Sequence, residues 1–379
     1  MNNKICIYTI CKNEIQFVDR WLENMKEADS IVVLDTGSTD GTYEYLQAKQ
    51  KDYPQLIVRQ EIISPWRFDV ARNESMRDIP ADCNILMSTD LDEILEPGWG
   101  DEIRGRWLEG VHERGIYLYS WSHQADGTSG RIFRYDKIHS RKWKWIAPVH
   151  EYLYNTEINK NFYTPEQTLD LTDTDIVHLH HYPDPNKSRG QYLQLLELRK
   201  QEMPEDWYGL IYLAQEYCYR GFYDKAINEF MFILDHYQQH YSTLEQASCY
   251  LFMGDSYMKL QDYNNAFLSY LKAINIEPTY REPYLNLAKC MIETKEYDLA
   301  IHYVKQGLKK SWRHYTWLER DTSWTWEPWD LLCMSSFYNG DKLNSIAYAA
   351  KALNFEPTNE RLKYNLNICI SLSKEEELY

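Results

Sequence analysis

The sequence predicts an α/β domain followed by an all-helical repeat domain, and three observations lead to this fold class. The chain has 379 residues, more than one ordinary hydrophobic core needs. Its first half alternates apolar runs of strand length with amphipathic helical segments, which is typical of a parallel sheet with crossover helices. Beyond Pro204 the pattern changes to paired helices that recur at a fixed spacing. We therefore expect two domains, at residues 1–203 and 204–379.

The predicted sheet begins with two apolar strands joined by a helix. Residues 4–10 are mostly apolar and are expected to form a first strand buried on both faces, and residues 14–26 have the apolar periodicity of an amphipathic helix. Residues 30–34 form a second apolar run, which ends in the turn Asp35-Thr36-Gly37-Ser38. Small and acidic residues of this kind form tight turns and cap a following helix. The order strand, helix, strand brings Asp35 to the carboxyl edge of the sheet.

Two aspartates, Asp90 and Asp92, follow a third apolar run at residues 84–88. In open α/β sheets, ligands bind at the carboxyl ends of the strands. Paired carboxylates there suit Mg²⁺ or Mn²⁺, which takes the rest of its coordination from water and substrate phosphates. The pair therefore indicates a metal and diphosphate site. A polar strand exit that caps the next helix is an equally valid interpretation of Asp-x-Asp alone.

A basic stretch interrupts an otherwise acidic protein. The formal net charge is −16, and both halves of the chain share the acidic excess. Neither half has the basic face that binding to nucleic acid needs. Residues 131–144 reverse the sign locally, with the basic side chains Arg131, Arg134, Lys137, Arg141, Lys142 and Lys144. We interpret the stretch either as a loop that faces a diphosphate or as a solvated hairpin face.

These segments, taken in order, resemble the motifs of family 2 inverting glycosyltransferases with the GT-A fold. The resemblance covers roughly residues 3–200 and depends on residues 5–14, the Asp35 turn, Ala71-Arg72-Asn73 and residues 89–93. It implies a Rossmann-like nucleotide-diphospho-sugar transferase domain, a UDP-sugar donor and an Mn²⁺ or Mg²⁺ cofactor. Many relatives have a second aspartate where this chain has Thr36.

The resemblance also implies roles for single residues. Asp35 would contact the uracil or the ribose, Arg72 would hold the nucleotide, Asp90 would meet the ribose and Asp92 would hold the metal. Arg131 joins them from the basic stretch. The expected nucleotide-sugar contacts are Thr9, Glu14, Asp35, Arg72, Asp90, Leu91 and Arg131.

Inversion needs a base that takes the proton of the acceptor as it attacks, and a carboxylate is the usual group. Residues 143–151 resemble the Trp…His-Glu motif on the acceptor side of a subset of these enzymes, so Glu151 is the first candidate. Asp126, in residues 124–128, is the second.

Besides Asp92, His150 and His180 are candidate metal ligands, because the fold often brings a late histidine to the metal. Alternation along a strand would place His178 and His180 on one face. A structural role is the alternative for each histidine.

The second half matches the two-helix tetratricopeptide pattern. Ala266 and Ala300 occupy equivalent positions 34 residues apart, which is the period of this repeat. We expect about four repeats and a capping helix over residues 359–373. An insertion before the fourth copy contains four tryptophans, Trp312, Trp317, Trp324 and Trp326. They form either a platform for peptide or sugar, or a surface that packs on the transferase domain or on a second subunit.

The two domains together are similar to the S-glycosyltransferases of the sublancin type, which modify cysteine in glycocin peptides. They also resemble transferases of lipopolysaccharide or surface-glycan assembly. We predict a metal-dependent inverting hexosyltransferase with a peptide or protein acceptor, because helical repeats present a concave surface that binds peptides. The repeats can equally serve as a module for homodimerisation.

The alternative from another class is a scaffold with a dead transferase domain, whose repeats bind a protein partner. The retained carboxylates of the first half speak against it. No apolar run of about 18 residues is present to span a bilayer, and the N-terminus has no signal-peptide pattern. We therefore expect a cytoplasmic protein without a membrane span.

Overall fold

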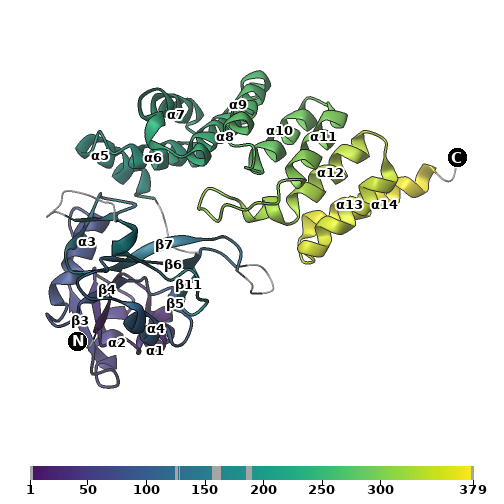
Figure 1. The fold of residues 1–379 in the computed structure, drawn as a ribbon. Coiled ribbons are helices and arrows are strands. Elements are labelled where there is room, and N and C mark those ends of the chain that lie inside the picture. Colours follow the sequence, from purple (N-terminus) through teal and green to yellow (C-terminus); the bar gives the residue numbers. More distant parts are fainter. Residues whose placement is uncertain (1–2, 124–126, 128, 156–163, 185–189, 377–379) are drawn as a thin grey trace. The chain divides into compact units, whose positions relative to one another are not determined.

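The computed structural model describes residues 3–123, 127, 129–155, 164–184 and 190–376. The chain divides into two compact units, Met1–Pro204 and Glu205–Tyr379, and each is described by itself. The first unit is built around a mixed β-sheet, and the second consists of helices (Figure 1).

The main sheet of the first unit has the strand order β3-β2-β1-β4-β7-β6-β11-β5, and β10 pairs with β6. Strand β1 runs parallel to β2 and β4, and β2 runs parallel to β3. Strand β7 is antiparallel to its neighbours β4 and β6, and β5 is antiparallel to β11. The strands are β1 (Ile5–Cys11), β2 (Ser30–Asp35), β3 (Leu56–Gln60), β4 (Ile85–Ser88), β5 (Glu93–Leu95), β6 (Arg114–Ser120), β7 (Ile132–His139), β10 (Thr168–Asp170) and β11 (His178–His181).

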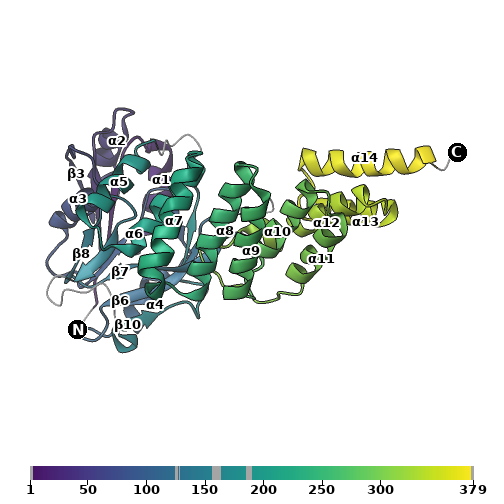
Figure 2. The same ribbon diagram turned by 90° about the horizontal axis from the view of Figure 1, so that it is seen from above.

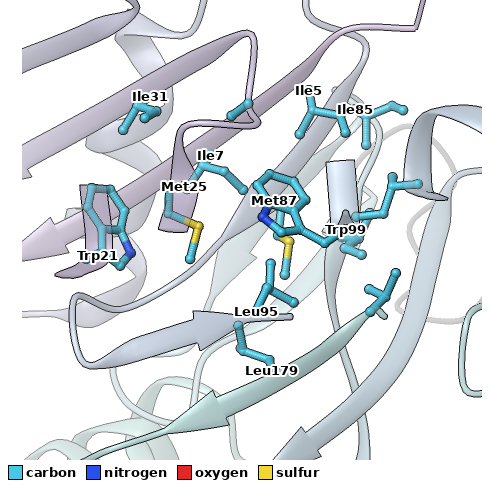
Figure 3. Close-up of a cluster of buried hydrophobic side chains, with 14 of the residues drawn as sticks. Ile5, Ile7, Trp21, Met25, Ile31, Ile85, Met87, Leu95, Trp99 and Leu179 are labelled. Atoms are coloured by element: carbon cyan, nitrogen blue, oxygen red, sulfur yellow. The ribbon is translucent and has the colours of Figure 1, made fainter. Parts of the chain in front are cut away.

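One face of the sheet packs against helices. Ile5 and Ile7 of β1 lie in a cluster of buried side chains with Trp21 of α1 and Trp99 of α4 (Figure 3). Burial of such large apolar side chains stabilises the fold by about 1.5 to 3 kcal/mol each. The helices of this unit are η1 (Ile15–Phe17), α1 (Val18–Met25), α2 (Thr42–Lys49), α3 (Phe68–Ser75), η2 (Met76–Asp78), α4 (Trp99–Arg106), η3 (Pro165–Gln167) and α5 (Tyr192–Glu202).

The other face of β1 is covered by a hairpin. Strands β8 (Trp143–Ile146) and β9 (Tyr152–Asn155) form a separate two-stranded sheet. Trp143 and Trp145 of this hairpin pack on Cys6 and Tyr8, which alternate with the residues of the helical face. Because both faces of β1 are covered, the strand is buried along its whole length.

The second unit is a stack of antiparallel helix pairs (Figure 2). In the described residues, four pairs follow one another and α14 comes last. The helices are α6 (Trp207–Tyr219), α7 (Tyr223–Tyr237), η4 (Gln238–His240), α8 (Thr243–Lys259), α9 (Tyr263–Ile276), α10 (Glu282–Glu293), α11 (Tyr297–Leu308), η5 (Asp321–Trp324), α12 (Glu327–Tyr338), α13 (Lys342–Phe355) and α14 (Glu360–Glu376).

Small side chains let the two helices of a pair approach closely. A Cβ added to Gly254 of α8 would lie 2.4 Å from the ring of Tyr270 on α9. Ala266 and Ala300 are fully buried at the equivalent contacts that the repeat pattern marks. The α/β domain followed by tetratricopeptide-like helices confirms the fold class expected from the sequence.

Helices long and apolar enough to cross a bilayer do not occur in the described part of the chain.

Candidate active site at the carboxyl ends of the central strands

The carboxyl ends of β1, β2 and β4 meet at one edge of the sheet, because these strands are parallel neighbours. Strand β2 ends at Asp35, and β4 ends at Ser88, one residue before the Asp-x-Asp segment begins at Asp90. This edge is where ligands bind in open α/β sheets.

Asp35 organises the turn after β2. One of its carboxylate oxygens accepts hydrogen bonds from the backbone amides of Gly37 and Ser38, both at 2.9 Å, and from the side chain of Gln60 at 2.9 Å. The other oxygen accepts the thiol of Cys11 at 3.7 Å. Gly37 has a φ of +100°, which favours glycine. These bonds explain the aspartate as a residue that shapes the turn, and its contact with the uracil stays a prediction.

Arg72 lies at the centre of the strand ends. Its side chain is only 5% exposed, and its three nitrogen atoms bind three different groups. Nη1 donates to Ser88 Oγ at 2.8 Å, Nη2 donates to Asp90 Oδ1 at 3.1 Å, and Nε donates to Glu151 Oε1. The guanidinium also lies over the ring of Trp145, 5.4 Å from its centroid. Arg72 therefore joins the end of β4 to the loop that carries Glu151.

The neighbours of Arg72 in the sequence hold the β8 hairpin in place. Asn73 donates to the carbonyl of Trp145 at 2.7 Å and accepts its backbone amide at 3.0 Å. The Trp145 indole donates to Tyr8 at 2.7 Å, and Tyr8 lies 2.6 Å from Nε2 of His139. Burial lowers the pKa of His139 to about 4, so its ring is neutral. The Ala71-Arg72-Asn73 motif thus fixes both the guanidinium and the hairpin beside it.

A buried lysine faces the acidic segment from β7. Lys137 Nζ lies 3.6 Å from Asp90 and 3.7 Å from Glu93. Burial alone would lower the pKa of Lys137, but the two carboxylates outweigh it, so its pKa is raised. Glu93 accepts the backbone amide of Asp90 at 2.8 Å and the hydroxyl of Tyr119 at 2.9 Å. Burial raises the pKa of Glu93, which Lys137 opposes. These contacts fix the shape of the segment from Asp90 to Glu93.

Asp92 is paired with His181, the last residue of β11. Asp92 Oδ2 lies 3.6 Å from His181 Nε2, and both side chains are largely buried. The Nδ1 side of the ring is 3.2 Å from the carbonyl of Trp121, so an Nδ1–H donates there and Nε2 faces the carboxylate. Burial alone would lower the pKa of His181, but Asp92 outweighs it and raises this pKa.

The two histidines expected at the metal have other neighbours. His180 Nε2 lies 3.1 Å from Glu96, and its Nδ1 lies 3.2 Å from His123. Burial lowers the pKa of His180, although Glu96 opposes this. His150 is exposed, and its ring contacts Tyr192 of α5. The structure thus brings His181, and not His180, to the side of Asp92.

The remaining expected contacts are divided between buried and accessible groups. Thr9, Glu14 and Leu91 are buried, and Leu91 belongs to the hydrophobic core. Arg131 is partly exposed, and among the described residues its buried Nε has no hydrogen-bond partner. Asp126, the second candidate for the base, lies outside the described residues.

The basic stretch is largely a strand and not a loop, since β7 covers residues 132–139. Lys137 faces the acidic segment, whereas Arg141 donates to the carbonyl of Cys83 at 2.7 Å and Lys142 pairs with Glu113. Lys137 is one of the six basic residues of this stretch, and no sequence pattern distinguishes it from the other five. Its position follows from the register in which Ile138 of β7 pairs with Met87 of β4.

Asp92 and His181 fit a divalent cation that takes most of its ligands from elsewhere. A carboxylate oxygen and an imidazole nitrogen face each other, and the other ring nitrogen is anchored on a carbonyl, as is usual for histidine ligands. Within the described residues, no three His, Cys, Asp or Glu side chains are grouped so that they would hold an ion by themselves. The arrangement therefore suits an ion that a diphosphate and water help to coordinate.

Carboxylates and cations from several elements thus meet at the carboxyl edge of the sheet, and two family models match the chain. Residues 6–112 match the model described as Glycosyl transferase family 2, and residues 254–292 match the TPR repeat. The protein thus contains a family 2 glycosyltransferase domain followed by tetratricopeptide repeats, and it is a glycosyltransferase. No curated protein matches the chain.

Several solved TPR proteins are similar to parts of the chain. A thermophilic TPR protein from Thermus thermophilus is 20% identical, with 47% of this chain and 88% of that chain covered and a TM-score of 0.38. The MamA protein is 17% identical, with 46% and 96% covered and a TM-score of 0.36. The APC/C hetero-tetramer Cut9-Hcn1 is 13% identical, with 48% and 33% covered and a TM-score of 0.40. At these TM-scores the likeness carries no argument about function.

Proposed function

We propose that the protein is a metal-dependent inverting glycosyltransferase that moves a sugar from a UDP-sugar to a peptide or protein acceptor. The observation that carries the proposal is the bridge made by Arg72, which binds Asp90 on one side and Glu151 on the other. Asp90 is the residue proposed for the donor, and Glu151 is the residue proposed as the base. The two roles would thus be held next to each other at the carboxyl edge of the sheet.

The donor would be bound by groups of both charges. Asp90 has a side chain that is 33% exposed, so it can accept a hydrogen bond from a ribose hydroxyl. Arg131 and Lys137 are cationic side chains of β7 and the residue before it, and they would lie along the diphosphate. Arg72, which binds Asp90, would also stabilise the negative charge of the diphosphate. The buried residues Thr9, Glu14, Asp35 and Leu91 would support the donor-binding groups at this edge of the sheet.

Asp92 and His181 would hold Mn²⁺ or Mg²⁺. When bound, such an ion supplies positive charge to the diphosphate leaving group. His181 replaces His180 in this proposal, because His181 is the histidine beside Asp92.

In the transfer step the thiol or hydroxyl of the acceptor attacks the anomeric carbon from the side opposite UDP. The new bond to carbon forms as the bond between carbon and the UDP oxygen breaks, and the electron pair leaves with UDP. The acceptor's proton passes to Glu151. Arg72 binds only Oε1 of this carboxylate, so Oε2 is the atom that would receive the proton.

We propose the domains as residues 1–203 for chemistry and residues 204–379 for interaction with proteins. A polypeptide acceptor is favoured because repeats of this kind serve protein recognition. Cysteine is the acceptor residue that the similarity to glycocin transferases suggests, and serine is the alternative to compare with it.

The deciding experiment has two stages. First, a panel of UDP-sugars is incubated with Mn²⁺ or with EDTA, and released UDP is measured together with UDP binding by calorimetry. Second, matched peptides that differ only in cysteine or serine are added, and mass spectrometry detects the added sugar. Metal-dependent UDP release and sugar transfer support the proposal. Absence of both UDP binding and UDP release would favour a scaffold without catalysis.

A further inference from the structure

The segment between α11 and α12, residues 309–326, runs back along the first helices of the preceding repeats (Figure 1). Most of it has no regular structure apart from η5. Its partners come from α6, α8, α10 and α12, the first helix of each pair. Repeat stacks form an extended concave surface from successive repeats, and these proteins use that surface for binding. We call this segment the inner segment.

An aromatic contact fixes the inner segment to the first repeat of the unit. The ring of Trp317 stacks on Tyr212 of α6, with centroids 5.0 Å apart and an angle of 28° between the rings. The next residue, Leu318, is buried in the hydrophobic core of the repeats. The carbonyl of Leu318 accepts the hydroxyl of the buried Tyr280 at 3.0 Å.

Arg320 binds acidic side chains of the next two repeats. Its Nη2 donates to Asp255 of α8 at 2.6 Å, and its backbone amide donates to Glu282 of α10 at 2.8 Å. The other oxygen of Asp255 accepts the hydroxyl of Tyr270 at 2.8 Å and the side chain of Asn286 at 2.6 Å. Arg320 is therefore bound at a site that three helices build together, and a charge-assisted bond of this kind is strong.

The end of the inner segment is bound in the same way. The hydroxyls of Thr322 and Ser323 donate to Glu327 of α12, at 2.8 and 3.2 Å. Arg281 donates to the carbonyl of Ser323 at 3.1 Å, and its guanidinium lies 3.7 Å from the ring centroid of Trp324. Backbone and side chains are thus bound in turn, as in a peptide complex.

We propose that the inner segment is the resident ligand of the repeat surface. This surface recognises an aromatic side chain followed three positions later by an arginine, and the chain supplies both as Trp317 and Arg320. The proposal does not depend on the glycosyltransferase chemistry. It implies that a peptide that carries the same two side chains binds here only when the inner segment is released.

The inner segment has an advantage over a free peptide because it belongs to the same chain as the surface that it binds. A tethered ligand acts at an effective concentration of about millimolar for a short linker. A peptide of the same sequence, added from solution at micromolar concentration, would therefore not replace it. Removal of the two anchoring side chains from the chain should open the surface to that peptide.

The test uses the full chain and a fluorescent peptide of residues 311–325. Wild type should not bind the peptide at micromolar concentration, whereas Trp317→Ala/Arg320→Ala should bind it. A peptide with alanine in place of Arg320 is the matched control, and the double variant should bind it at least about tenfold more weakly, as expected for the loss of a charged hydrogen bond. Equal binding to wild type and the double variant, or no binding to a folded double variant, would overturn the proposal.

Hydrogen exchange gives a second readout if the double variant is poorly folded. Arg320→Ala alone should increase amide exchange in residues 309–326 and in α8 and α10. Trp312→Ala is the control within the inner segment, because Trp312 is 67% exposed and should leave exchange unchanged. Unchanged exchange in Arg320→Ala, measured on folded protein, would show that the contacts of Arg320 do not hold the segment.

Discussion

Each unit of the molecule contains an arginine that joins groups from separate segments. Arg72 in the first unit binds Asp90 and Glu151, and Arg320 in the second unit binds Asp255. Each arginine also donates to a neutral polar side chain, which is Ser88 for Arg72 and Asn286 for Arg320. The two networks have the same chemistry, but they differ in how their excess negative charge is balanced.

In the first unit, three carboxylates lie around two permanent cations, and a fourth carboxylate pairs with a histidine. The three are those of Asp90, Glu93 and Glu151, the cations are Arg72 and Lys137, and the fourth, Asp92, faces His181. A surplus of buried carboxylate is costly unless a further cation neutralises it. With His181 neutral, as a metal ligand must be, the first network has a surplus of negative charge that the proposed divalent ion would balance.

In the second unit, the surplus is relieved by a proton. Glu282 is buried and accepts the backbone amide of Arg320 with one oxygen, and burial raises its pKa to about 7. The network of Arg320 thus has a carboxyl group that is neutral over part of the usual pH range. One network is suited to bind a cation, and the other is suited to hold helices and a segment together.

Removal of Asp92 should have the largest effect, because it deletes the proposed metal ligand of the first network. Asp92→Ala should lower turnover by about 10³-fold or more, since a bound ion contributes several kcal/mol to the transition state. Calorimetry should show weaker UDP binding in the presence of Mn²⁺ and unchanged binding in EDTA. Equal UDP affinity of wild type and variant with Mn²⁺ would remove the metal role of Asp92.

Glu151 is expected to have the next largest effect. Glu151→Gln should fold and bind the UDP-sugar, and kcat should fall by about 10² to 10⁴, the usual contribution of a general base. A cysteine acceptor forms more thiolate as the pH rises towards its ordinary pKa of about 8.5, so with a thiol the deficit should shrink at higher pH. With a serine acceptor it should persist. A near-normal kcat at pH 7 would leave Asp126 as the next candidate.

Local patterns predicted the fold and much of the candidate site. The apolar runs marked the strands that end near Asp35 and Asp90, and the 34-residue spacing marked the helix pairs. These features depend on residues close together in sequence, so the sequence alone contains them.

Features that depend on pairing between distant segments could not be predicted from local sequence patterns. Alternation along β11 correctly put His178 and His180 together, since their rings stack 4.3 Å apart. Which face meets Asp92 depends on the register of β11 with β5 and β6, and a shift of one residue exchanges the faces. For the same reason the sequence did not distinguish Lys137. The contact of Trp317 could not be predicted either, because its partner Tyr212 lies in the same unit but far away in sequence.

Two adjacent histidines test which side chain of the first network binds the metal. His181→Ala should weaken Mn²⁺-dependent binding of UDP by about 10-fold or more, as expected when a histidine beside a metal is lost. His180→Ala is the matched control one residue away, and it should leave this affinity nearly unchanged because His180 faces Glu96 and His123. The titration is run with each variant at constant pH with and without EDTA. The opposite order of effects would return His180 to the metal site.

The smallest effect concerns the proton in the second network. The raised pKa of Glu282 means that the folded protein binds a proton more tightly than the unfolded chain, so stability is present at low pH and is lost as the pH rises through about 7. Gln imitates the protonated side chain at every pH. Glu282→Gln should therefore resemble wild type at pH 5 and be more stable at pH 8, by up to a few kcal/mol, since each pKa unit corresponds to about 1.4 kcal/mol.

Urea unfolding of both proteins at pH 5 and pH 8 measures this difference directly. Glu293→Gln on the same helix is the control, because Glu293 is exposed and its replacement should have the same effect at both pH values. A difference between Glu282→Gln and wild type that does not change with pH would mean that Glu282 is ionised throughout. The network of Arg320 would then need a cation just as the network of Arg72 does, and the distinction between the two would be lost.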